Sequence, residues 1–373
     1  MKKIFLLILV MPLLGHGQDA FTVSNIPGVT ANFFTLQGAV DSAPAGSVLY
    51  VFPSPIDYGN VILHKKLSIY GTGFMLDQNI FPYTAPNKYG VTLTSVFFGP
   101  GSDNSYIEGL QVIGLTANAL GLYRFYLDSV NNVTISRCYA DIWPNYPVGN
   151  ITIQTVNTFD CSFNQCYLYL NNLEAPNHSG GSFYSEWGIG SQNLQFKNNI
   201  IDSRGYPTSF YVSGANSQPG GSSTVFTNNT IICGIPSSNF GNSTLINNFI
   251  INTDLTGTIS FANNVHGVNI NNITNASNLF APNSGNYQQA KIDSIFAYSG
   301  FGYHSFDQSW QVKDTSFAKT FATDGKEAGA YGGNDPYVLS GIPNLPNIYD
   351  INITADANKR GNILVHIKGK ATY

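Results

Sequence analysis

Three charged residues within one short stretch could carry out acid–base chemistry. Lys197, Asp202 and Arg204 fall in FKNNIIDSRGY, which begins at Phe196. A lysine or arginine with a lowered pKa can act as a general base, and a carboxylate can donate or accept the matching proton. The alternative is a solvated corner with a surface ion pair, which contributes little energy. We favour the surface ion pair and keep the three residues as weak catalytic candidates.

A second group with suitable chemistry lies in NHSGGSFYSEWGIG, residues 177–190. There His178, Tyr184, Glu186 and Trp187 combine aromatic rings with polar groups. A sugar ring can stack on an aromatic face while its hydroxyls form hydrogen bonds, so this set suits glycan binding. Burial of Trp187 under a folded-back loop explains the same residues equally well. Neither group has metal-ligand spacing, so the sequence predicts no metal site.

Internal repeats indicate which elements must position these residues. Successive repeats are separated by 28, 33, 30, 19 and 16 residues, a variable period that fits a solenoid with a fixed corner and loops of different lengths. The intervening segments are short, β-rich and bounded by Gly, Asn and Ser, which predicts a right-handed parallel β-helix. The aligned units are ISRCYADI from Ile135, FNQCYLYL from Phe163, FKNNIIDS from Phe196, FTNNTIIC from Phe226, LINNFIIN from Leu245 and FANNVHGV from Phe261.

The two central residues of each unit are expected to face opposite ways. The first column begins with Arg137, which favours a solvent-facing position. The second begins with Cys138, and cysteine is among the most buried residue types, so this column is expected to point inward. Stacked inward Asn amides can donate and accept between coils, and Asn tolerates a left-handed corner; a ligand-binding Asn row is less favoured. The first column continues with Gln165, Asn198, Asn228, Asn247 and Asn263, and the second with Cys166, Asn199, Asn229, Asn248 and Asn264.

Cys138 and Cys166 are 28 residues apart at equivalent positions of consecutive repeats. The spacing of paired strands, about 4.8 Å, falls within the ~4.4–6.8 Å that separates the Cα atoms of disulfides. A disulfide and a stack of reduced thiols are therefore both open.

The N-terminus predicts export. Lys2 and Lys3 precede the apolar run from Ile4 to Leu14, and small residues follow before Gln18, as in a secretory signal peptide over residues 1–17. The run is too short to cross ~30 Å of hydrocarbon. We expect a mature chain secreted or held at the cell surface, with no membrane span. A net charge of −4 gives no reason to expect nucleic acid or an anionic membrane as a partner.

The segment from Phe33 to Phe74 resembles the opening of the pectin-lyase-like right-handed β-helices. Leu36, Ala39 and Val40 match the apolar face of the capping helix in that family, and Val48 to Phe52 match its first strand. Residues 317–337 resemble the closing coil of secreted bacterial β-helix proteins of uncharacterised function. The resemblance implies an all-β solenoid over residues 18–335 with a helical cap at its N-terminal end.

The same resemblance narrows the enzyme chemistry. Polysaccharide lyases of this fold use an Arg or Lys base, and Ca²⁺ held by acidic residues, so a lyase activity would imply Ca²⁺ as a cofactor. Polygalacturonase-like hydrolases carry Asn-Thr-Asp, Asp-Asp and Gly-His-Gly motifs. This chain has Asn252-Thr253-Asp254, but it has no Asp-Asp pair, and its Gly-His-Gly lies in the signal peptide. The hydrolase activity is therefore not carried over.

Residues 336–373 differ in texture from the repeats. Pro343 and Pro346 lie in a linker-like stretch, and the alternating runs IYDINITA and NILVHIKG predict a β-hairpin. The hairpin could pack on the last coil or form an appendage for attachment, and we favour the packed cap.

Two functions remain. The favoured one is a secreted or surface β-helix that binds an extracellular polysaccharide or cell-surface glycan without catalysis. The alternative is a polysaccharide lyase or related carbohydrate-active enzyme. We favour binding because charged residues, 10% of the chain, are sparse for β-elimination.

Overall fold

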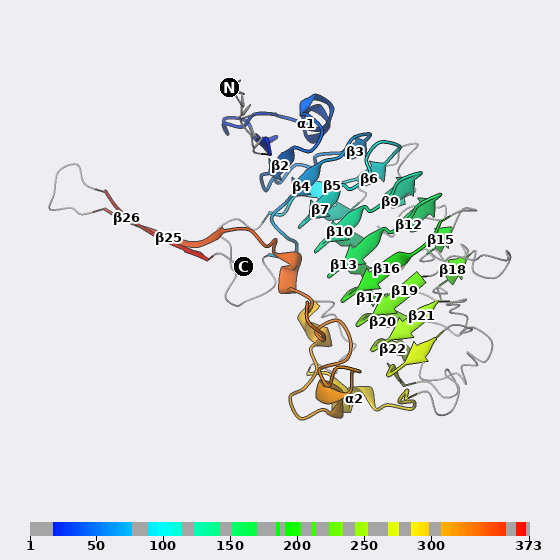
Figure 1. The fold of residues 1–373 in the computed structure, drawn as a ribbon. Coiled ribbons are helices and arrows are strands. Elements are labelled where there is room, and N and C mark those ends of the chain that lie inside the picture. The colour runs from blue at the N-terminus through cyan, green and yellow to red at the C-terminus, as the bar shows by residue number, and fades with distance from the viewer. Residues whose placement is uncertain are drawn as a thin grey trace, which may run out of the picture.

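The fold is a parallel β-helix with a projecting hairpin (Figure 1). The computed structural model describes residues 18–76, 89–113, 123–141, 151–169, 184–186, 191–202, 211–213, 224–233, 243–252, 268–275, 285–297, 307–355 and 363–370. The predicted signal peptide lies outside these residues. No helix in this described part of the chain is long and apolar enough to cross a membrane.

Three parallel sheets run along the solenoid in the described residues. A coil adds at most one strand to each sheet, and some coils have no strand in sheet B or C. Sheet A has ten strands, in the order β1 (Ala20–Val23), β2 (Val48–Val51), β4 (Ser68–Tyr70), β7 (Tyr106–Glu108), β10 (Thr134–Ser136), β13 (Ser162–Asn164), β16 (Leu194–Lys197), β19 (Thr224–Thr227), β21 (Thr244–Ile246) and β23 (Asn269–Ile270). Sheet B has four strands, β3 (Asn60–Leu63), β6 (Ser95–Phe98), β9 (Tyr123–Asp128) and β12 (Ile151–Val156). Beside β12 lies the pair β15 (Tyr184–Glu186) and β18 (Tyr211–Ser213). Sheet C has eight strands, β5 (Thr92–Leu93), β8 (Gln111–Ile113), β11 (Tyr139–Asp141), β14 (Tyr167–Tyr169), β17 (Ile200–Asp202), β20 (Thr230–Cys233), β22 (Phe249–Asn252) and β24 (Ile273–Thr274).

The core lies inside the coils because alternate residues of every strand point inward. Phe163, Phe196 and Phe226 occupy the same position in consecutive coils and are fully buried. Their rings stack with centroids 5.2 and 4.8 Å apart. A single repeat could not bury its own phenylalanine, and stacking the repeats buries the whole column.

Inward asparagines connect the coils at the corner between sheets A and C. Asn229 Oδ1 accepts from the backbone N of Asn199 at 2.9 Å, and Asn229 Nδ2 donates to the carbonyl of Phe196 at 2.9 Å. The same bonds recur at Asn248, Asn272 and Asn286. The repeat alignment was wrong at its last unit, because Asn272 rather than Asn264 follows Asn248 in the hydrogen-bonded row. Asn264 lies outside the described residues.

The first column does not face solvent, and that expectation was wrong. Gln165, Asn198, Asn228 and Asn247 are each 7% exposed or less. These residues, with Arg137 and Asn271, have φ between 47 and 58°. The left-handed corner position therefore belongs to this column and not to the inward one. A later part of the chain covers it.

That cover is the return segment, residues 307–344, which runs back along the corner toward the N-terminal end (Figure 1). Asn271 Nδ2 donates to Phe321 O, Asn247 Nδ2 to Thr323 Oγ1, Gln165 Nε2 to Pro336 O and Arg137 Nη1 to Ile342 O. The expected closing coil at residues 317–337 is instead this lengthwise segment, which has three short 3-10 helices, Asp307–Trp310, Phe317–Thr320 and Leu339–Gly341. A short helix, α2 (Ile292–Ile295), precedes it.

The return segment also covers the outer face of sheet C. Tyr167, Ile200 and Phe249 point outward from that sheet and are buried in a second apolar core with Trp310 and Tyr337. The solenoid therefore has one face occupied by its own chain, while the outer faces of sheets A and B are not part of this core.

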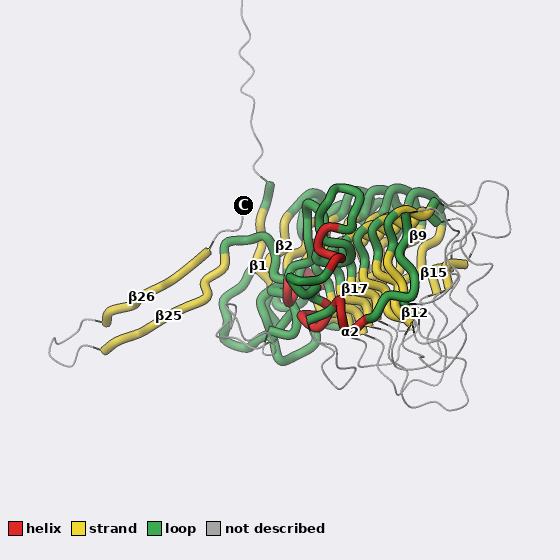
Figure 2. The backbone as a smooth tube through the Cα atoms, turned by 90° about the horizontal axis from the view of Figure 1, so that it is seen from below, coloured by secondary structure: helices red, strands yellow, loops and turns green. Residues whose placement is uncertain are grey.

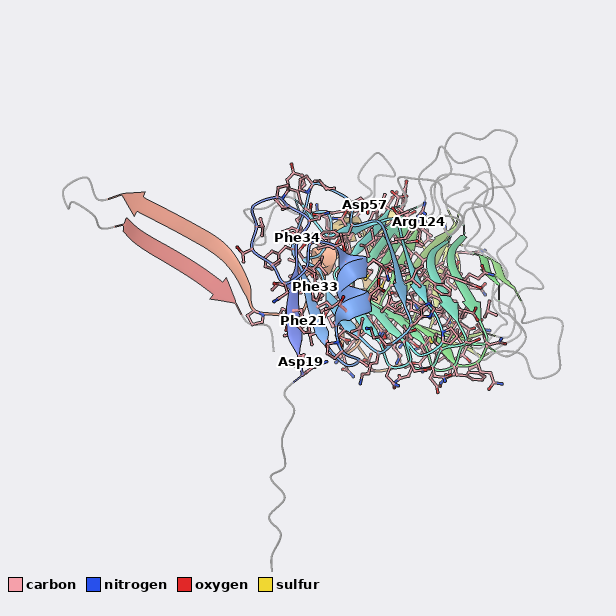
Figure 3. All side chains as sticks on the ribbon, turned by 90° about the horizontal axis from the view of Figure 1, so that it is seen from above. Asp19, Phe21, Phe33, Phe34, Asp57 and Arg124 are labelled. Carbon is pink, nitrogen blue, oxygen red and sulfur yellow. The ribbon has the colours of Figure 1, made fainter. Side chains whose placement is uncertain are left out.

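The N-terminal end is capped as the sequence predicts. Helix α1 (Leu36–Ser42) buries Leu36, Ala39 and Val40, and the Thr35 side chain accepts from the backbone N of Gly38. The free edge of β1 is protected as well, because Asn32 Oδ1 accepts from the backbone N of Thr22. Figure 3 shows Phe21, Phe33 and Phe34 at this end.

The C-terminal hairpin forms as predicted, from β25 (Asn347–Ala355) and β26 (Ile363–Lys370) in antiparallel register. It projects from the body instead of packing on the last coil (Figure 2). The favoured packed cap was therefore wrong, because the return segment brings the chain to the N-terminal half before the hairpin begins (Figure 1).

Candidate functional site

The outer face of sheet B carries an aromatic row. The register of β3, β6 and β9 aligns Ile62, Phe97 and Tyr126 in consecutive coils, and all three are half-buried. The rings of Phe97 and Tyr126 stack with centroids 5.0 Å apart and planes 28° apart. The exposed His64 ring packs against Phe97 in a T-shaped arrangement, with the two ring centroids 6.0 Å apart. Apolar rings held side by side on a rigid strand pair form a platform that a flat, partly apolar ligand can cover.

A polar row lies beside this aromatic row, at the starts of the same strands. Ser95 Oγ donates to Asn60 Oδ1 at 2.7 Å, and Thr94 Oγ1 donates to Asp57 Oδ2 at 3.0 Å. Burial raises the pKa of Asp57, although hydrogen bonds from the backbone N of Gly59 and from the Thr94 hydroxyl oppose the rise. Figure 3 shows Asp57 and Arg124 along the same side of the body.

Arg124 is the largest fully buried side chain in the described residues, with 2% of it exposed. It is the second residue of β9 and points out of the core, since its neighbour Phe125 points in. Its Nε donates to the backbone carbonyl of Asp141 at 2.7 Å. A guanidinium keeps its charge and its planar donors when buried, so it holds this edge of sheet B against the end of sheet C.

The end of sheet C carries a row with two carboxylates. Asp141, Tyr169 and Asp202 occupy the same position in three consecutive coils, just before the chain leaves for sheet B. Two coil spacings separate the two aspartates, which is about 10 Å between their backbones. Both lie on the outer side, because their neighbours Ala140 and Ile201 belong to the inner core.

Two tyrosines hold these carboxylates. Tyr139 Oη donates to Asp141 Oδ2 at 3.0 Å, and Tyr167 Oη donates to Asp202 Oδ2 at 3.2 Å. Burial, with the charge of Asp141 next in importance, raises the pKa of Tyr139 well above its usual range. The phenol therefore stays protonated and acts as a donor, which fixes the orientation of the carboxylate.

The weak catalytic candidates do not form one cluster within the described residues. Lys197 ends β16 in sheet A and is exposed, whereas Asp202 ends β17 in sheet C and is fully buried. The corner that contains Asn198 and Asn199 separates them. Arg204 lies outside the described residues.

Two of the four predicted glycan-binding residues lie in the described part of the chain. Tyr184 begins β15 and Glu186 ends it. The register pairs Tyr184 with Tyr211 and Glu186 with Ser213 on β18. His178 and Trp187 lie outside the described residues, so this group stays a prediction.

Three cysteines, Cys138, Cys161 and Cys166, are free. All three are fully buried thiols, and Cys166 Sγ lies 3.5 Å from the carbonyl of Ile135. Two coils later, Asn229 Nδ2 donates to Phe196 O from the equivalent position. The Cys166 thiol therefore takes the place of an amide in the inward row. Burial raises the pKa of Cys166 to about 12. Of the two arrangements left open, the structure has the reduced stack.

No group of three or more His, Cys, Asp or Glu side chains in the described residues could hold a metal ion. The site that the structure does bring together contains residues that sequence reasoning missed, namely Phe97, Tyr126, Arg124 and Asp141. Their only sequence signal was alternation within short strands, and the unequal repeats hid the alignment between coils.

Comparison with known proteins adds one likeness of fold. No protein-family model matches the sequence, and no curated protein matches it. Among solved structures, the chain is similar to a pectin methylesterase mutant in complex with hexasaccharide IV, with 9% identity and a TM-score of 0.30. The match covers 74% of this chain and 94% of that one. At this TM-score the match carries no argument about activity.

Proposed function

We propose that this protein is an exported β-helix that binds an extracellular polysaccharide on the outer face of sheet B. The observation that carries the proposal is the Phe97–Tyr126 stack, with ring centroids 5.0 Å apart. A sugar ring has apolar C–H faces and a rim of hydroxyls, so it suits a site where aromatic rings adjoin hydrogen-bonding groups. Hydrogen-bonding groups beside the stack come from Asn60, from Ser95 and from Asp141 at the end of β11.

Rigidity supports binding to an extended polymer. The aromatic row lies on paired strands whose other face is core, so little side-chain and backbone freedom is lost when a ligand binds. The pair β15 and β18 lies beside β12 on the same side of the solenoid, and we extend the proposed site to Tyr184 and Glu186 on β15. The predicted signal peptide agrees with a partner outside the cell.

The test is a binding screen of the purified mature chain against neutral and uronate polysaccharides, by affinity electrophoresis. We expect retardation by at least one polymer and no new chain ends. Unchanged mobility in every gel would overturn the proposal. Phe34→Ala is a matched control, because Phe34 is 66% exposed but lies at the N-terminal cap.

A second function, a carbohydrate-active enzyme, is favoured by one observation. Asp141 and Asp202 lie two coils apart, at a backbone separation of about 10 Å, near the ~6.5–9.5 Å between the carboxyl groups of inverting glycosidases. New reducing ends, or ultraviolet-absorbing unsaturated ends, would reveal turnover. Loss of turnover in Asp202→Asn, Arg204→Ala or Glu186→Ala would then assign the activity to the substituted residue.

A further inference from the structure

The outer face of sheet A carries a tyrosine ladder at its N-terminal coils. Tyr50 and Tyr70 are paired in register on β2 and β4, and their rings stack with centroids 5.8 Å apart and planes 26° apart. Tyr106 on β7 follows, with its ring centroid 5.6 Å from that of Tyr70. Tyr50 is 36% exposed, and the other two are half-buried. The three rings therefore follow one another along the solenoid axis, and Tyr50 is the most exposed of them.

Hydroxyl and amide side chains continue the same face beyond the tyrosines. The register aligns Tyr106, Thr134 and Ser162 in consecutive coils. Ser162 Oγ donates to Thr134 Oγ1 at 3.2 Å, and Asn164 Nδ2 donates to Ser162 Oγ at 3.3 Å. These groups are half-buried and mutually bonded, so they present donors and acceptors in fixed positions about 4.8 Å apart along the axis.

The charge on this part of the face is balanced. Glu108, which follows Tyr106 by two residues, is 3% exposed and forms an ion pair with Arg137 at 3.0 Å. The backbone N of Asn344 in the return segment donates to the same carboxylate. Burial raises the pKa of both Tyr70 and Tyr106, with Glu108 as the next cause, so the phenols stay neutral. The ladder therefore offers neutral hydroxyls and no net charge.

We infer that this face is a second binding surface, and that its ligand is an uncharged, linear polysaccharide. A sugar polymer without carboxylates matches rows of neutral donors and acceptors, whereas a charged polymer would lose hydration over the tyrosine coils without gaining an ion pair there. The exposed charge on this face, Lys197, lies one coil beyond Asn164 and away from the tyrosines. A second copy of the chain fits less well, because the polar row of Thr134, Ser162 and Asn164 lacks the apolar centre typical of homodimer interfaces. This inference rests on the proposed function, since it assigns a further surface to the same class of partner.

The test compares the two faces in one protein. Tyr50→Ala/Tyr70→Ala removes the ladder on sheet A, and Tyr126→Ala removes the stack on sheet B, each beside the control Phe34→Ala. We expect the double variant to bind a neutral polymer at least fivefold more weakly than the wild type does, while Tyr126→Ala retains part of this affinity. Circular dichroism and the unfolding midpoint verify that each variant is folded.

The outcomes separate this inference from the proposed function. If Tyr126→Ala abolishes all binding and the ladder variant binds like the wild type, the sheet A surface is refuted and the sheet B site stands. If only uronate polymers depend on the ladder, the uncharged ligand class is wrong. If the wild type binds no polymer, both proposals fail. If the wild type is oligomeric and the ladder variant is monomeric, a second copy of the chain occupies the surface, and the inference is overturned.

Discussion

The side-chain amide nitrogen of Asn198 lies 2.9 Å from the backbone carbonyl of Ala330, which is 132 residues further along the chain. The same nitrogen donates to the carbonyl of Gly332 at 2.7 Å. A residue at a solenoid corner thus fixes the return segment in place. The corner column and the return segment are one structural unit, and this unit covers the apolar residues on the outer face of sheet C.

Removing that amide should loosen the return segment. Asn198→Gly keeps the left-handed backbone, with φ near 54°, but removes the donor to the carbonyls of Ala330 and Gly332. The Ala330 carbonyl keeps its bond from the backbone N of Tyr337, so the Gly332 carbonyl is the group that loses most. We expect a loss of ~1–3 kcal/mol in the free energy of unfolding, measured by urea denaturation. Lys197→Ala, at the exposed neighbouring position, is the control and should change it by less than ~0.5 kcal/mol. Equal effects of both substitutions would contradict this role for Asn198.

The inward asparagines should be far less tolerant. Asn229→Leu has a similar volume, but it removes the acceptor of the Asn199 backbone N and the donor to Phe196 O, both at 2.9 Å. Orphaned buried groups cost ~1–3 kcal/mol each, so we expect a loss of at least ~3 kcal/mol. Denaturant unfolding of the variant measures it. A variant as stable as Thr227→Ala, on the neighbouring open face, would refute the hydrogen-bonded row.

Stability should fall at alkaline pH. Burial raises the pKa of Cys166 from 9.0 to about 12, and it raises the pKa of Tyr331 and Tyr337 well above 10.0. The unfolded chain therefore releases these protons first. Their contribution is complete below pH 9 and is lost as the pH rises toward the folded-state values. The free energy of unfolding should stay level from pH 8 to about pH 9 and then decrease up to pH 11, and a profile that stays flat to pH 11 would contradict the burial of these groups.

The hairpin should be dispensable for the body. A chain that ends at Pro346 retains the return segment and lacks β25 and β26. Because the hairpin projects from the solenoid, we expect the thermal midpoint of the body to change by less than ~2 °C. Differential scanning calorimetry of both chains measures this. A drop of ten degrees would mean that the hairpin packs on the body after all.

The sequence predicted the architecture well because its signals were local. Leu36, Ala39 and Val40 match the capping helix that the family resemblance implies, and Cys138 marks an inward position by residue type. The covered corner was missed because arginine is usually solvent-facing, and because Ile342, which accepts from Arg137, lies 205 residues further along the chain. No local pattern reports such a contact.

The site was harder to predict for a related reason. Phe97 and Tyr126 are 29 residues apart and meet only through strand register, whereas the repeat alignment followed the Asn corner on another side of the coil. Asp202 was found from its neighbours in sequence, but its hydrogen-bond partner is Tyr167, one coil earlier. Chemistry on a solenoid is assembled across coils, so sequence neighbours such as Lys197 and Asp202 can lie on different sheets.

The affinity of Tyr126→Ala for the best polysaccharide of the screen tests the central claim most directly. Titration calorimetry should show at least tenfold weaker binding than the wild type, equal to ~1.4 kcal/mol, while Phe34→Ala binds like the wild type. Both variants must keep the wild-type unfolding midpoint. Wild-type affinity in a folded Tyr126→Ala variant would contradict polysaccharide recognition on the outer face of sheet B.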